Sequence, residues 1–211
     1  VAGGVTVGNS TFVGGDIQTE AGVVVIGLNS FIAGSVVTSA GGITIGIGST
    51  ITNNVTSTGA GVVTGTGVKI FNNLSTVTGA VTVTGSSVGG NLKIAGAGVM
   101  TTTNTVIGCN ASTVVGAVTM TNSYIGGSVL SGAAITMTGS QAGGNVISDA
   151  ALTITNSSVG GAIISGAAIT ITNSTQNNGT NIVNCGDLNG NAKIIYREER
   201  KEQNDIIYSL F

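Results

Sequence analysis

A short unit repeats at a fixed spacing in the second half of the chain. Residues 118–173 read VTMTNSYIGGSVLSGAA, ITMTGSQAGGNVISDAA, LTITNSSVGGAIISGAA and ITITN, so a Thr-x-Thr motif returns every seventeen residues. A unit this short cannot bury its apolar side chains alone and becomes stable only by stacking on its neighbours. The repeat therefore predicts a solenoid, in which successive units stack along one axis.

The composition favours a solenoid built from strands. The 211 residues include 36 Gly and no Pro, and Val, Ile, Thr, Ser and Asn fill most of the other positions. β-Branched residues favour strands, whereas Gly and Asn favour corners. Disorder is not expected, because 41% of the residues are hydrophobic and the net charge is only −2.

The repeat continues upstream. Six earlier units align with the four above, and they begin at Val5, Val24, Ile43, Val63, Val81 and Met100. Gly, Asn and Ser mark three corners in each unit, for example at Asn122-Ser123 and Gly126-Gly127, with Asn53-Asn54 and Asn72-Asn73 as earlier forms of the second. The predicted fold class is all-β: a single-stranded β-solenoid (β-helix) of about ten three-stranded rungs, called coils below, over residues 1–188.

Alternation along each strand predicts which side chains form the core. In the unit at Ile135, period two places Ile135 and Met137 inside and Thr136 and Thr138 outside. Three later strand positions, Val129, Val146 and Ile163, are also expected to face inward. The units shorten from nineteen or twenty residues to seventeen along the chain, which predicts a narrowing cross-section.

The end of the chain does not follow the repeat. Four of the six basic residues lie in the segment 189–211, at Lys193, Arg197, Arg200 and Lys201, between apolar stretches. An open solenoid end exposes unpaired backbone, so this segment is predicted to be a charged C-terminal cap or tail that packs on the solenoid.

The two cysteines, Cys109 and Cys185, fall four coils apart. At roughly 4.8 Å per coil, their separation exceeds the Cα distance of about 7 Å that a disulfide tolerates. We expect two separate thiols unless the C-terminal segment folds back.

The charge distribution argues against nucleic acid and membrane partners. Only Lys69 and Lys93 precede residue 190, whereas a phosphate-binding face needs clustered cations. No apolar run reaches the length of a membrane span, and no basic segment with a following apolar core opens the sequence. We predict a secreted or extracellular protein whose signal peptide has already been removed.

The sequence also argues against an enzyme. Histidine is absent, and the four carboxylates of the repeat region, Asp16, Glu20, Asp149 and Asp187, are spread from the first coil to the last. Acid–base catalysis by carboxylates needs two of them on one face. We expect no catalytic residues, no cofactor and no metal site, and Asp16 and Glu20 are interpreted as solvated charges rather than calcium ligands.

Threonine occupies both outward positions of the first strand in seven successive coils. The first file consists of Thr64, Thr82, Thr101, Thr119, Thr136, Thr153 and Thr170, and the second file of Thr66, Thr84, Thr103, Thr121, Thr138, Thr155 and Thr172. Stacked strands would space these side chains about 6.7 Å apart along a strand and about 4.8 Å apart between coils. A β-branched side chain on a fixed backbone has few rotamers, so such a lattice can hold ordered, ice-like water.

Strand propensity alone could also explain threonine at exposed positions. The outward positions of the second strand, however, vary freely, as Ser87, Tyr124 and Gln141 show. In the first three coils Gly8, Gly27 and Gly46 replace the second threonine, so the array is expected to weaken there.

Over Val63–Asn173 the array resembles the β-solenoid ice-binding (antifreeze) proteins, in which Thr-x-Thr motifs on one flat face adsorb to ice. The resemblance implies an antifreeze or ice-recrystallisation-inhibiting activity carried by the fourteen threonines, with an ice surface and its ordered water as the partner. The sequence departs from that pattern in its early coils, in its scarcity of cysteine compared with the insect forms, and in its charged C-terminal segment.

A second outward feature is apolar. Leu130, Ile147 and Ile164 are predicted to stack on the outside of the third strand, with Lys93 at the equivalent place in an earlier coil. Monomers usually cover such a stripe. Either the C-terminal segment covers it or it forms a weak dimer contact.

A second function also fits the sequence. The Gly/Val/Ile pattern is similar to bactofilin-like polymer-forming β-helices, and the N-terminal unit shows no cap. The alternative is therefore a structural or adhesive solenoid that assembles end to end or forms part of a larger surface protein.

Overall fold

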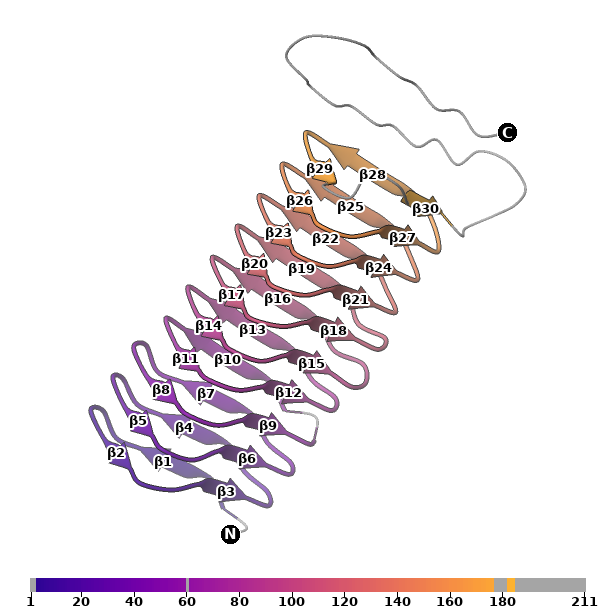
Figure 1. Cartoon of the computed structure of the whole chain (residues 1–211). Coiled ribbons are helices and arrows are strands. Elements are labelled where there is room, and N and C mark those ends of the chain that lie inside the picture. Colours follow the sequence, from indigo (N-terminus) through magenta and orange to yellow (C-terminus); the bar gives the residue numbers. More distant parts are fainter. Residues whose placement is uncertain (1–2, 60, 177–181, 185–211) are drawn as a thin grey trace, which may run out of the picture.

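The computed structural model shows the all-β solenoid that the repeat predicts. It describes residues 3–59, 61–176 and 182–184, and over these residues the chain forms strands and no helix. The strands make three parallel sheets of ten strands each, and every coil contributes one strand to each sheet. Figure 1 shows the coils stacked along a single axis, with β1 in the first coil and β28 in the last.

Sheet A holds the first strand of each coil. Its members in order are β1 (Val5–Val7), β4 (Val24–Ile26), β7 (Ile43–Ile45), β10 (Val63–Thr66), β13 (Val81–Thr84), β16 (Met100–Thr103), β19 (Val118–Thr121), β22 (Ile135–Thr138), β25 (Leu152–Thr155) and β28 (Ile169–Thr172). The strands have three residues in the first three coils and four from β10 onward.

Sheets B and C hold the second and third strands. Sheet B consists of β2 (Phe12–Val13), β5 (Phe31–Ile32), β8 (Thr50–Ile51), β11 (Lys69–Ile70), β14 (Ser87–Val88), β17 (Val106–Ile107), β20 (Tyr124–Ile125), β23 (Gln141–Ala142), β26 (Ser158–Val159) and β29 (Thr175–Gln176). Sheet C consists of β3 (Ile17–Thr19), β6 (Val36–Thr38), β9 (Val55–Ser57), β12 (Leu74–Thr76), β15 (Leu92–Ile94), β18 (Ala111–Thr113), β21 (Val129–Ser131), β24 (Val146–Ser148), β27 (Ile163–Ser165) and β30 (Ile182–Asn184).

The core is one continuous column of aliphatic and methionine side chains from Val7 to Ile171. Ile135 and Met137 are buried as predicted, and so are Val129 and Val146. Because side chains alternate across a strand, the residues between them face outward. Burial of the inward residues on all three sheets therefore fixes which residues reach the surface.

The coils shorten at their corners. The register step falls from nineteen residues, Val5 to Val24, to seventeen, Leu152 to Ile169. The corner between sheets B and C keeps its length, from residues 14–16 to 160–162, whereas the corner between sheets C and A shrinks from 20–23 to 166–168. The strands of sheets B and C keep their lengths, so the shortening leaves the core strands aligned.

The corner between sheets C and A brings backbones very close. A Cβ atom added at Gly116 would overlap the carbonyl oxygen of Gly98 in the preceding coil. Glycine is required there because no side chain fits between the two coils.

The corner between sheets B and C contains a ladder of asparagines. The alignment predicted from the sequence, which matches Asn53-Asn54 with Gly89-Gly90, is wrong by one residue. The backbone N–H groups of Thr52 and Gly89 make equivalent bonds to the preceding coil, so Thr52-Asn53 is the counterpart of Gly89-Gly90. Asn54 instead lines up with Asn73 and Asn91. The Asn54 Oδ1 atom accepts bonds of 3.1 Å from both the backbone N–H and the side-chain amide of Asn73, and Asn91 repeats this on Asn73.

Thr102 and Thr105 are both buried in the same coil but differ in their hydrogen bonding. The Thr105 Oγ1 atom donates to the carbonyl oxygens of Val83 and Thr103 at 3.1 and 2.9 Å. Thr102, which points into the core between Val83 and Met120 of the adjacent coils, has no partner for its Oγ1 atom among the described residues. A buried hydroxyl without a partner lowers stability.

The same substitution should therefore have opposite effects at these two positions. Thr102→Val removes an unpaired hydroxyl and should raise the free energy of unfolding by about 1 kcal/mol. Thr105→Val leaves buried carbonyl groups without their donor and should lower it by about 1–3 kcal/mol. Thermal or chemical denaturation followed by circular dichroism measures both, and equal effects of the two changes would contradict this assignment of the core.

Candidate functional site

The outward face of sheet A carries both threonine files. All fourteen predicted residues lie on strands of this sheet, and each is exposed or half-buried. Within the threonine-bearing part, from β10 to β28, every threonine of a file pairs in register with the threonine of the next coil, for example Thr136 with Thr153 and Thr138 with Thr155. The structure thus brings the fourteen side chains together in two straight rows, which we call the threonine face.

The threonine face is uncharged and firmly supported. The strands of sheet A contain no Asp, Glu, Lys or Arg. Beneath the rows, the inward residues between the two threonines of each coil are buried, among them Val83, Met120 and Ile154. Each threonine therefore stands on a strand whose other side is packed into the core.

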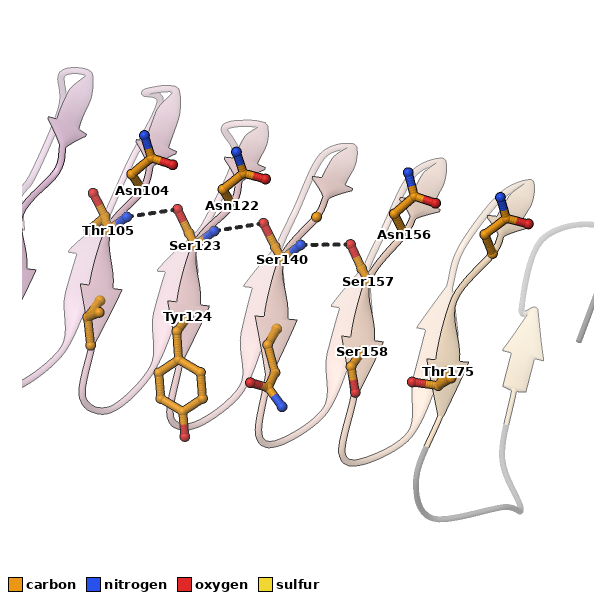
Figure 2. A pocket seen from close by; sticks show the side chains of 14 residues that line it. Asn104, Thr105, Asn122, Ser123, Tyr124, Ser140, Asn156, Ser157, Ser158 and Thr175 are labelled. Carbon is orange, nitrogen blue, oxygen red and sulfur yellow. Dashed lines mark hydrogen bonds between the residues drawn. The ribbon is translucent and has the colours of Figure 1, made fainter. Parts of the chain in front are cut away.

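A row of buried hydroxyl groups holds the backbone next to the second file. We call this row the serine ladder; its members are Ser30, Ser49, Ser86, Thr105, Ser123, Ser140, Ser157 and Ser174. The backbone N–H of Ser123 donates to Ser140 Oγ at 3.1 Å, and that hydroxyl donates to the Thr138 carbonyl oxygen at 3.0 Å. Figure 2 shows these bonds running from coil to coil.

The serine ladder is interrupted once, in the fourth coil. Val68 occupies the ladder position there, between Ser49 and Ser86, and it is buried. A Cβ atom on Gly65, inside β10, would lie only 2.6 Å from Val68 Cγ2. The valine therefore fills the space that a larger residue at position 65 would take, which explains a glycine within a core strand.

The second file ends at Thr66 for a steric reason. Gly8, Gly27 and Gly46 follow sheet A strands that are one residue shorter than those from β10 onward. In these early coils the chain from the start of the first strand to the start of the second is one residue longer than in the later coils. A Cβ atom on Gly46 would lie 2.6 Å from the carbonyl carbon of Gly27. Threonine cannot simply be substituted at this position, so the early coils lack the second file, as expected.

The first file extends further toward the N-terminus than predicted from the sequence. Thr44 is exposed and pairs in register with Thr64. Val25 occupies the equivalent position in the preceding coil, and Thr6 occupies it in the first coil. The alignment of the units predicts Thr44 and Thr6 in this row, but the predicted site excludes them because their coils lack the second threonine.

The remaining candidate residues lie elsewhere. Lys93, Leu130, Ile147 and Ile164 share one outward row on sheet C, with Ser112 between the first two. Leu130 is 37% exposed, and the two isoleucines are half-buried. The apolar stripe is thus present, and the C-terminal segment 189–211 that was expected to cover it lies outside the described residues.

The carboxylates are dispersed over the described coils. Asp16, Glu20 and Asp149 are exposed, and no three of the described His, Cys, Asp or Glu residues are grouped so that they could hold a metal ion. Asp16 is more than a solvated charge, because its Oδ1 atom accepts a 2.6 Å bond from the Ser35 backbone N–H. Asp187 lies outside the described residues.

Cys109 is exposed and forms no disulfide with a described residue, and Cys185 lies outside the described residues.

Comparisons of the chain with protein-family models, curated proteins and solved structures return no match. Within the described part of the chain, no helix is long and apolar enough to span a membrane.

The serine ladder predicts a measurable effect on the second file. Ser140→Ala leaves the Ser123 backbone N–H and the Thr138 carbonyl oxygen without their side-chain partner, and should lower the free energy of unfolding by about 1–3 kcal/mol. Hydrogen exchange should become faster at the backbone amide of Ser123. Ser87→Ala, on the outer side of sheet B, is the matched control and should change neither quantity; equal effects of both variants would show that the ladder does not support this corner.

Proposed function

We propose that the protein binds ice through the threonine face, as an antifreeze or ice-recrystallisation-inhibiting protein. The observation that carries the proposal is the in-register pairing of threonines in two files across seven coils, from β10 to β28. No catalytic step, cofactor or charge is needed for such an activity. The ligand is an ice surface together with the water ordered on it.

The hydroxyl and the methyl group of each threonine would contribute differently to ice binding. The hydroxyl can take a place in a hydrogen-bonded water lattice, and the methyl group orders the water that surrounds it. Parallel strands set the spacing at about 4.8 Å between coils and about 6.7 Å along each strand. Because χ1 is restricted and the backbone is packed from beneath, little side-chain entropy is lost on adsorption.

Neither of the other sheets offers an equivalent surface. The outward row of sheet B contains Val106, Tyr124 and Gln141 in successive coils, which differ in size and chemistry. The outward row of sheet C changes from Lys93 to Ser112 to Leu130. Among the sheets of the described coils, the face of sheet A alone repeats the same side chain at the same height, which a crystalline ligand requires.

A bulky residue in the middle of the first file tests the proposal. Thr136→Tyr places a ring above the flat surface, so ice can no longer meet the neighbouring threonines, and thermal hysteresis should fall at least about tenfold. The matched control is Thr56→Tyr, which makes the same change at a half-buried outward position of sheet C. The control should keep full activity.

Both variants should fold, because tyrosine is well tolerated in strands. Circular dichroism spectra and melting temperatures equal to those of the wild type would verify this before activity is compared. Full thermal hysteresis in a folded Thr136→Tyr variant would contradict the assignment of the face. Filaments seen by electron microscopy, combined with a wild type that neither shapes ice crystals nor slows recrystallisation, would favour the end-to-end assembling solenoid instead.

A further inference from the structure

A second surface of different character lies along the corner between sheets A and B. A shallow trough with a volume of about 700 Å³ crosses five successive coils, from the coil of Asn104 to that of Asn173. Its floor is the serine ladder, and Figure 2 shows asparagines along one rim and the outward side chains of sheet B, including Tyr124, along the other. Asn, Ser, Thr, Gly, Gln, Val and Tyr residues line the trough, with no charged side chain among them.

The asparagine rim has unused hydrogen-bonding groups. Asn104, Asn122 and Asn156 adopt positive φ angles of 48–49° at this corner, and their side-chain amides make no hydrogen bond to a described residue. Gly85 and Gly139 meet the same backbone requirement in other coils, so the corner itself does not require an amide. These amides differ from the asparagine ladder at the next corner, where each Oδ1 atom is occupied by the following coil.

The opposite rim supplies an aromatic ring. Tyr124 is 44% exposed, and Figure 2 shows its ring projecting beside the trough in line with the side chain of Ser158 two coils on. The coil between them presents Gln141, a further amide. Amides on both rims and one exposed aromatic ring form a surface that is polar but neutral, above ladder hydroxyls that are buried and bonded within the protein.

The backbone of the floor is not available to a peptide. The N–H groups of Thr105, Ser123 and Ser140 each donate to the ladder hydroxyl of the next coil, at 3.3, 3.1 and 3.0 Å. An added peptide strand needs a row of free backbone donors as well as acceptors, and these donors are already paired. The absence of cations likewise gives no means of holding phosphate groups.

We propose that this trough binds an uncharged, extended glycan whose chain runs along the solenoid axis. The side-chain amides of the two rims would bond to sugar hydroxyls, and the Tyr124 ring would pack on the apolar face of one sugar ring. The coil spacing of about 4.8 Å is close to the length of one hexose unit in an extended β-1,4-linked chain, so each coil meets about one sugar. The proposal uses other residues than the threonine face and does not depend on ice binding.

Isothermal titration calorimetry with linear hexasaccharides of β-1,4-linked glucose and of β-1,4-linked N-acetylglucosamine tests the inference. The wild type should bind at least one of them, and Tyr124→Ala should weaken binding about tenfold through loss of the stacked ring. The double change Asn122→Gly with Asn156→Gly should weaken it at least as much. Glycine keeps the positive φ of both corners, so the fold should survive, as circular dichroism would verify.

The control is again Thr56→Tyr, on a different sheet, which should bind as the wild type does. If the wild type binds neither of the two neutral hexasaccharides, the proposal is overturned. Binding that is unchanged in both trough variants would overturn the site, and preference for an oligogalacturonate of the same length would overturn the claim that the ligand is uncharged. Thermal hysteresis measured on the same variants should stay at the wild-type value, which separates this test from that of the threonine face.

Discussion

The structure depends on parallel, in-register stacking of one coil on the next. Every strand of the inner coils hydrogen-bonds to the equivalent strands before and after it in the same sheet. Once the register is fixed, a residue type repeated in the sequence becomes a straight row in space at about 4.8 Å spacing. The aliphatic core column, the threonine face and both corner ladders are all consequences of this one constraint.

Polar groups at the corners must be satisfied because strand hydrogen bonds end there. The serine ladder does this between sheets A and B, and asparagines do it between sheets B and C. Between sheets C and A, buried hydroxyls such as Ser131 and Ser165 donate to carbonyl oxygens of the preceding corner at 2.7 and 2.6 Å. In the described coils these bonds satisfy corner groups without using the outward side chains of the sheets.

Much of the fold could be predicted from the sequence because two periodicities coincide in it. Period two along a strand separates Ile135 and Met137 from Thr136 and Thr138, and the unit length gives the number of coils. The serine ladder could not be identified, since a serine after an asparagine is equally typical of an exposed turn. The register of Asn54 was misplaced by one residue because adjacent asparagines give no sign of which one faces the next coil.

The limits of the threonine face also have a structural origin. The sequence shows that Gly46 replaces a threonine, but the extra corner residue and the close approach to Gly27 appear only in three dimensions. Thr44 extends the first file beyond the point at which the second begins. The face therefore has two rows of threonine from β10 onward, whereas the early coils have threonine in the first row alone, with Val25 in its place in the second coil.

The central claim is that a flat, uncharged lattice of threonines adsorbs to ice. The most direct measurement is to grow a single ice crystal in a dilute solution of the fluorescently labelled protein and image where the label enters. If the threonine face binds ice, fluorescence should appear on discrete planes of the crystal. A label excluded from the ice and left in the remaining liquid would contradict it.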